Sequence, residues 1–106
     1  MNKIDKPTLE DMGRALGGNV KIKLTKLSEA PDPTHPNNIK EGEYRVGYIP
    51  EGTIPKIGER FLMGSVIEIN GDKVHPGHWF ITSEVMEVID PFTFRTLNSV
   101  YKIELL

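Results

Sequence analysis

Short runs of alternating apolar and polar residues, separated by glycine and proline, are the dominant pattern of this sequence. The run VKIKLT at positions 20–25 is the clearest, because an apolar residue stands at every second position. A period of two is typical of a strand with one buried face. The sequence therefore predicts a mainly β protein built from short strands.

Further strands are expected at EYRVGYI (43–49), RFLMGSVIEI (60–69), WFITSEVMEVI (79–89), FTFRT (92–96) and SVYKIELL (99–106). Gly47 and Gly64 are expected kink points inside them. Asn70-Gly71 predicts a tight hairpin turn, after which the chain is expected to loop through VHPGH before re-entering a strand near Trp79. Kinked short strands favour a small, strongly bent β-barrel of SH3-like type with about six strands. An OB-type barrel is the alternative, and it ordinarily has its helix in the middle of the strand order.

One short helix is expected at about 8–17, before the barrel at about 19–106. Thr8 is a plausible N-cap with Asp11 three residues later, and Gly17 and Gly18 supply a stop. A helix of this length must dock on something larger to be stable. The chain of 106 residues is expected to form a single domain. A long proline-rich loop, at about 28–42, is either a binding loop or a crossing between sheet edges.

Composition makes several classes of function unlikely. The formal net charge is -2, and neither half of the chain has an excess of basic residues, so nucleic-acid binding is not expected. Lys21, Lys23 and Lys26 are interpreted as lysines on the wet face of the first strand. The absence of cysteine excludes disulfides and thiolate chemistry. No apolar run is long enough for a signal peptide or a membrane span, and a cytoplasmic protein is expected.

The sequence predicts neither an enzyme nor a cofactor. Glu84 and Glu87 are three positions apart, so on a strand they point to opposite faces and form no acid–base dyad. His75 and His78 are weak candidates for metal ligands, and a site would need a further ligand such as Asp72 or His35. A plain surface loop is the favoured interpretation of these histidines.

Three aromatic residues, Tyr44, Tyr48 and Trp79, are candidates for contacting a partner. For the tyrosines, which share a face with Val46, packing in the core or across strands is the favoured alternative. For Trp79, which lies where a loop becomes a strand, capping of the barrel core is favoured over a ligand platform.

The segment FRTLNSVY (94–101) combines an expected turn with a cluster of polar side chains. A two-residue hairpin is expected at Leu97-Asn98, with Asn98 in the left-handed conformation. The turn does not explain Arg95. Its side chain either pairs with Glu84 or Glu87 or binds an anion through its guanidinium. The candidate ligand-binding residues are Arg95, Thr96, Asn98, Ser99, Thr82 and Ser83.

The C-terminal segment TSEVMEVIDPFTFRTLNSVYKIELL resembles the C-terminal half of small uncharacterised bacterial and phage-type proteins. The matching residues are Thr82, Ser83, Phe94, Arg95, Thr96, Asn98, Ser99 and Tyr101. The resemblance covers about a quarter of the chain. It implies an SH3-like barrel and a mobile-element ancestry, and it implies no activity.

Two functions follow as expectations. The first is a non-catalytic binding module, a bacterial or phage-type adaptor that contacts another protein. The second is a binder or sponge for a small anionic, nucleotide-like ligand, which would work as a homo-oligomer because a single small barrel has little concave volume.

Overall fold

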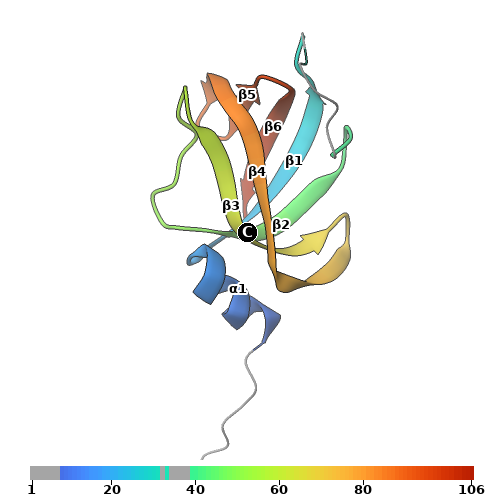
Figure 1. Ribbon diagram of the computed structural model, residues 1–106, viewed down its shortest axis with the longest axis vertical. Helices are drawn as coiled ribbons and strands as arrows, with labels where there is room; N and C mark the ends of the chain where they lie inside the picture. Colours follow the sequence, from blue (N-terminus) through green and yellow to red (C-terminus); the bar gives the residue numbers. More distant parts are fainter. Residues whose placement is uncertain (1–7, 32, 34–38) are drawn as a thin grey trace, which may run out of the picture.

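The computed structural model describes residues 8–31, 33 and 39–106. Its elements, in chain order, are α1 (Leu9–Gly17), β1 (Val20–Glu29), β2 (Tyr44–Ile49), β3 (Arg60–Ile69), β4 (Asp72–Asp90), β5 (Thr93–Thr96) and β6 (Ser99–Leu105). Each strand pairs antiparallel with the next, and β6 returns to β1, so the sheet is a closed barrel of six strands (Figure 1). The expected small, strongly bent barrel with one short N-terminal helix is confirmed. In the described part of the chain, no helix reaches the length and hydrophobicity that crossing a membrane requires.

The interior of the barrel is filled by apolar side chains that the period-two pattern predicts. Ile22 and Leu24 of β1 are fully buried there, as the alternation in VKIKLT indicates. Aromatic rings from three strands meet at the centre. The ring centroids of Phe61 and Phe94 lie 5.2 Å apart, and those of Phe94 and Tyr101 lie 5.5 Å apart. These contacts join β3, β5 and β6 across the barrel.

A second, smaller core lies outside the barrel, under α1. Tyr48 and Val46 are buried there with Ile67, while the alternate residue Gly47 faces the interior. The helix comes close enough that a Cβ added at Gly13 would lie 2.8 Å from atoms of the Tyr48 ring. Tyr48 is thus a packing residue, and its burial removes it from the surface that a partner could contact. Strand β2 is buried on both faces for this reason.

The ends of α1 follow the expected capping chemistry. The Thr8 side chain accepts a hydrogen bond from the Asp11 backbone N–H, and the Asp11 carboxylate accepts one from the Thr8 N–H. The hydrogen bond from Thr8, more than any other contact, lowers the pKa of Asp11. Leu16 does not take part in docking, because 60% of its surface is exposed.

The segment after the Asn70-Gly71 turn differs from the expectation. The turn itself is confirmed, since both residues have positive φ, 49° and 90°. The chain then continues directly as β4, which runs for 19 residues, so VHPGH lies within a strand rather than in a loop. Lys73 pairs with Glu68 and His78 with Val66, which leaves residues 74–77 opposite Ile67 alone. A large bulge of this kind bends the strand and lets one continuous β4 serve two parts of the barrel.

The proline-rich loop expected at about 28–42 begins later, because β1 extends to Glu29. Positions 32 and 34–38, including His35, lie outside the described residues. The loop returns to the barrel at Ile39, which is 1% exposed and belongs to the interior core.

Strands β2 and β3 approach so closely at Gly47 that a side chain there should destabilise the barrel. An added Cβ would lie 2.0 Å from the Ser65 carbonyl oxygen and 2.6 Å from the Met63 sulfur. Because the obstructing atom is backbone, Gly47→Ala should lower the free energy of unfolding by at least about 3 kcal/mol. Gly42→Ala is the control, because its Cβ would meet nothing within 4 Å and its positive φ costs only about 1–2 kcal/mol. Urea unfolding of both variants measures the difference, and equal losses would contradict this account of β2–β3 packing.

Candidate functional site

The polar cluster at the β5–β6 hairpin is organised around the hydroxyl of Thr96. Its Oγ1 accepts hydrogen bonds from the backbone N–H groups of Asn98, at 3.2 Å, and Ser99, at 3.1 Å. It also contacts the Ser99 carbonyl oxygen at 3.2 Å. Among the described non-glycine residues only Asn70 has a positive φ, so the left-handed conformation expected of Asn98 is wrong. The two-residue turn is instead stabilised by the Thr96 side chain, which satisfies the turn's backbone donors.

The neighbouring hydroxyls of Thr82 and Ser83 also serve the fold. Ser83 Oγ donates to Thr96 Oγ1 at 2.8 Å, which links β4 to the hairpin. Thr82 Oγ1 accepts from the Phe61 N–H at 3.0 Å and donates to the Ser83 carbonyl oxygen at 2.7 Å. Thr96, Ser99, Thr82 and Asn98 are all buried. The structure brings these candidate ligand residues together, but the hydroxyls of Thr96, Thr82 and Ser83 bind backbone groups and one another. Ser99 Oγ is buried and makes no such hydrogen bond.

Arg95 has the carboxylate partner that the sequence suggested. Its Nε lies 3.4 Å from Oε1 of Glu87, the residue directly opposite on β4. The pair lies on the partly exposed outer side of the barrel, where an ion pair adds little stability. Of the two carboxylates proposed, Glu87 is therefore the partner, and Glu84 instead stands opposite Arg60.

Replacing Thr96 by valine tests whether the hairpin depends on this hydroxyl. Thr96→Val keeps the shape but leaves two buried N–H groups and Ser83 Oγ without their acceptor, so it should cost about 2–3 kcal/mol of unfolding free energy. Arg95→Met, in the same hairpin, should cost less than about 1 kcal/mol. Chemical denaturation gives both values. A larger loss for Arg95→Met than for Thr96→Val would show that the cluster is not structural.

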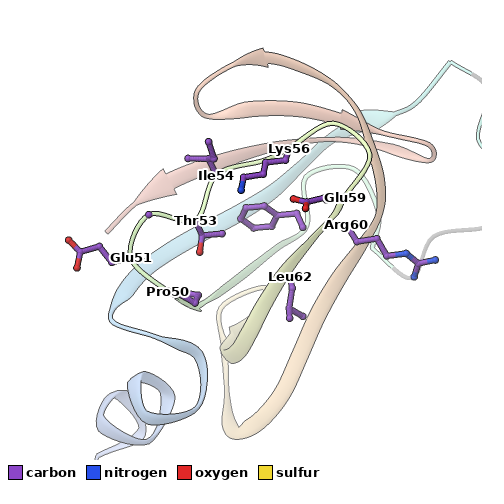
Figure 2. Close-up of a pocket in the computed structure, with 10 residues that line it drawn as sticks. Pro50, Glu51, Thr53, Ile54, Lys56, Glu59, Arg60 and Leu62 are labelled. Atoms are coloured by element: carbon purple, nitrogen blue, oxygen red, sulfur yellow. The ribbon is translucent and has the colours of Figure 1, made fainter.

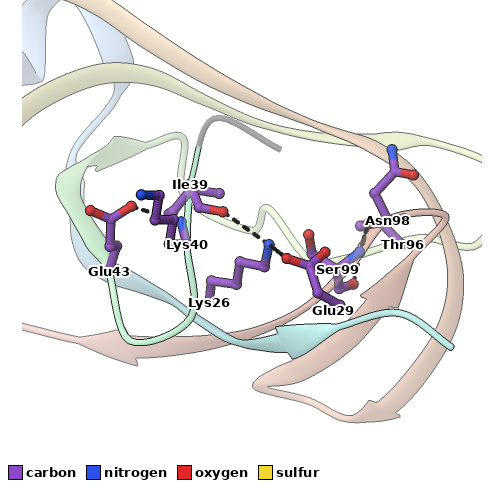
Figure 3. A network of polar contacts seen from close by, with 8 residues as sticks. All are labelled: Lys26, Glu29, Ile39, Lys40, Glu43, Thr96, Asn98 and Ser99. Atoms are coloured by element: carbon purple, nitrogen blue, oxygen red, sulfur yellow. Dashed lines mark hydrogen bonds and ion pairs between the residues drawn. The ribbon is translucent and has the colours of Figure 1, made fainter. Parts of the chain in front are cut away.

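Lys26 is a buried charged residue of the barrel. The expectation that Lys21, Lys23 and Lys26 all lie on the solvent-facing side of the first strand is therefore wrong for Lys26. Its side chain is 0% exposed, because position 26 shares the inward face with Ile22 and Leu24. The ammonium donates to Glu29 Oε1 at 2.5 Å and to the Ile39 carbonyl oxygen at 2.9 Å (Figure 3). The backbone of Lys26 adds to the connection, accepting from Gly42 N–H at 2.8 Å. Lys26 thus attaches the returning loop to β1.

Removing the Lys26 ammonium should loosen this end of the barrel. Lys26→Met fills a similar volume but leaves the buried Ile39 carbonyl without a donor, and the expected loss is about 1–3 kcal/mol. Lys102→Met is the matched control, because Lys102 is an exposed lysine of the neighbouring β6 and should change stability by less than about 0.5 kcal/mol. Thermal or urea unfolding measures both, and an unchanged Lys26→Met protein would remove the role given to this contact.

An open hollow of about 390 Å³ lies between the 50–59 loop and the start of β3 (Figure 2). Lys56, Glu59 and Arg60 contribute charged groups around it, and Leu62 contributes an apolar edge. Glu51 and Arg60 extend outward at opposite sides in Figure 2. Because Glu51 and Arg60 point away from one another, they do not form a carboxylate–arginine pair in the hollow.

The outer side of the β3–β4 pair carries an exposed apolar surface, which we call the β3–β4 strip: Leu62, Trp79 and Ile81. Leu62 and Ile81 are directly paired across the two strands, and Trp79 lies two residues before Ile81. The exposed fractions are 47% for Leu62, 64% for Trp79 and 37% for Ile81. Trp79 therefore does not cap the barrel core, and of the three aromatic candidates it is the most accessible to a partner.

A second hollow, of about 450 Å³, opens beside the strip. We call it the Arg45 hollow. It is lined mainly by apolar and aromatic residues, with two residues that can donate hydrogen bonds to a ligand: Arg45, Val66, Ile69, His78, Trp79, Phe80 and Ile81. Sequence patterns did not indicate it, because its walls come from β2, β3 and β4 and meet only through the curvature of the sheet.

The two histidines lie in and beside the β4 bulge, and both are exposed. Across residues 8–31, 33 and 39–106, no three His, Cys, Asp or Glu side chains are grouped closely enough to hold a metal ion. His35, the further ligand considered from the sequence, lies outside that range. The metal interpretation therefore gains no geometric support from the described residues.

No protein-family model matches the chain, and neither a curated protein nor a solved structure matches it. The class of the protein is thus given by its architecture, a small closed β-barrel with a helix on its outer side.

Proposed function

We propose that this protein is a non-catalytic binding module that docks another protein on the β3–β4 strip. The observation that carries the proposal is the side-by-side exposure of Leu62, Trp79 and Ile81 on paired strands. Exposed apolar side chains are unremarkable singly, but grouped on one face they are typical of interaction sites. Tryptophan is also among the residues that most often dominate binding energy at interfaces.

The strip has the layout expected of such a surface. Next to Leu62, Arg60 of β3 stands opposite Glu84 of β4, and both are exposed. An apolar centre with a charged margin allows desolvation in the middle and charge matching at the edge. The two hollows described above border the strip, with Leu62 lining one and with Trp79 and Ile81 lining the other.

The closed sheet favours docking through side chains over addition of a partner strand. Every described strand has two neighbours in the barrel, and closure removes the long free edges that strand addition needs. We therefore expect the partner to bind the side chains of the strip and not to add a strand to the sheet.

The alternative function, binding of a nucleotide-like anion at the β5–β6 hairpin, is supported less well. Thr96 and Ser83 bind each other, and Arg95 is paired with Glu87. A ligand would have to displace these contacts before it could use them.

The test compares three forms of the protein as baits in lysate from the source cells, with crosslinking and mass spectrometry. A specific partner should be enriched by the wild type and reduced at least about tenfold by Leu62→Ser and by Trp79→Ser, as expected for residues at an interface centre. Ile57→Ser is the matched control, because Ile57 is 68% exposed but lies outside the strip, and it should capture the partner as the wild type does.

Equal capture by all forms, or enrichment of nothing by the wild type, would overturn the proposal. Light scattering is run on the same samples to identify self-association. A dimer that Leu62→Ser dissociates would mean that the strip binds a second copy of this chain, which would also contradict docking of a different protein.

A further inference from the structure

The Arg45 hollow contains a guanidinium most of whose N–H donors have no hydrogen-bond acceptor among the described residues. Arg45 Nη1 donates to the Tyr44 carbonyl oxygen at 3.2 Å, the one hydrogen bond of this guanidinium within the described part of the chain. An arginine carries five N–H donors. Within the same residues no carboxylate forms an ion pair with it, in contrast to Arg95, which is paired with Glu87.

One carboxylate that interacts electrostatically with Arg45 is that of Glu43, and both of its oxygens accept hydrogen bonds from other groups. Glu43 Oε1 accepts from the Lys40 N–H at 2.7 Å, and Oε2 accepts from Asn70 Nδ2 at 2.9 Å. The hydrogen bond from Lys40 above all lowers the pKa of Glu43, and the positive charge of Arg45 also contributes. Glu43 thus stays ionised near Arg45 without occupying its donors.

The guanidinium is held over an aromatic wall. Its central carbon lies 5.7 Å from the centroid of the Phe80 ring, within the range of a cation–π contact. Phe80 is itself fixed by an edge contact with Tyr101, at 6.0 Å between centroids. Ile69 stands directly opposite Arg45 on β3. The half-buried charge is therefore positioned beside apolar surface.

We infer that the Arg45 hollow is a binding site for small amphipathic monocarboxylates, that is, molecules with one carboxylate and a compact aromatic or aliphatic body. The carboxylate accepts from the guanidinium, which binds such groups with two parallel hydrogen bonds. The body packs against Phe80, Ile69 and Trp79. A volume of about 450 Å³, apolar walls and few polar groups are the usual features of a small-molecule site.

The inference does not rest on the proposed protein docking, although Trp79 and Ile81 belong both to the strip and to the lining of the hollow. Its central residue, Arg45, is not part of the strip, and Leu62, which tests the strip, does not line the hollow. Failure of one proposal therefore leaves the other standing.

The sole tryptophan of the chain lines the hollow, so its fluorescence reports occupancy directly. The probe is 3-phenylpropanoate, titrated into the full chain with excitation at a wavelength it does not absorb. A saturable change with a Kd of about 0.1–1 mM is expected for a ligand of this size. The uncharged analogue 3-phenylpropanamide should bind at least about tenfold more weakly, because it lacks the charge that Arg45 recognises.

The variant Arg45→Met keeps an apolar stem and removes the guanidinium. It should lose the preference for the acid, so that acid and amide bind equally, while Arg95→Met keeps the wild-type preference. Circular dichroism checks that the variant is folded, and the acid–amide comparison on the wild type needs no variant at all.

Three results would overturn the inference: no saturable change up to about 10 mM probe, a range chosen to exceed the expected Kd about tenfold; equal binding of acid and amide by the wild type; or an unchanged preference in Arg45→Met.

Discussion

Closure of the sheet by β1 is the constraint on which the rest of the structure depends. β1 pairs with β2 through its first half and with β6 through most of its length, so it joins the beginning of the barrel to its end. Closure forces one side of every strand toward a common interior and leaves the other side to solvent or to α1. The inward position of Lys26 follows from this geometry, since it continues the face that begins with Ile22.

Several polar side chains that the sequence offered as candidate ligand contacts instead form hydrogen bonds that stabilise the fold. At one end of the barrel, Lys26 and Thr96 satisfy buried carbonyl and N–H groups that the returning loop and the β5–β6 turn would otherwise leave unpaired. Buried polar groups need such partners, because an unmade hydrogen bond costs more than a made one contributes. The two surfaces proposed for recognition, the strip and the Arg45 hollow, instead lie on or beside the curved β3–β4 pair.

The sequence predicted the elements better than the site. Thr8 and Asp11 cap the helix, Asn70-Gly71 makes the hairpin, and the strands lie near their expected positions, because caps, tight turns and alternation are local properties. The loop expected at VHPGH is wrong: proline and glycine usually interrupt a strand, but here the pairing of β4 with β3 accommodates them in a bulge. Lys26 could have been found from its parity with Ile22 and Leu24. Packing of Tyr48 was the favoured interpretation of the sequence, but its place in a second core under the helix was not predictable. The exposure of Trp79 was not predictable either, because both depend on where the helix and the bulge place neighbouring segments.

By itself, the sequence determined that this is a single small β-barrel with a helix before its first strand, since short alternating runs separated by turn residues have few other ways to bury their apolar faces. The tertiary structure alone decided the roles of the individual polar and aromatic residues. Arg95 and Arg45 both lie in strands with aromatic neighbours in the sequence, yet one is paired with Glu87 and the other stands over Phe80 in a hollow. The physical reason is that a side chain's partners across a curved, closed sheet come from segments far away in the chain, and alternation along one strand carries no information about them.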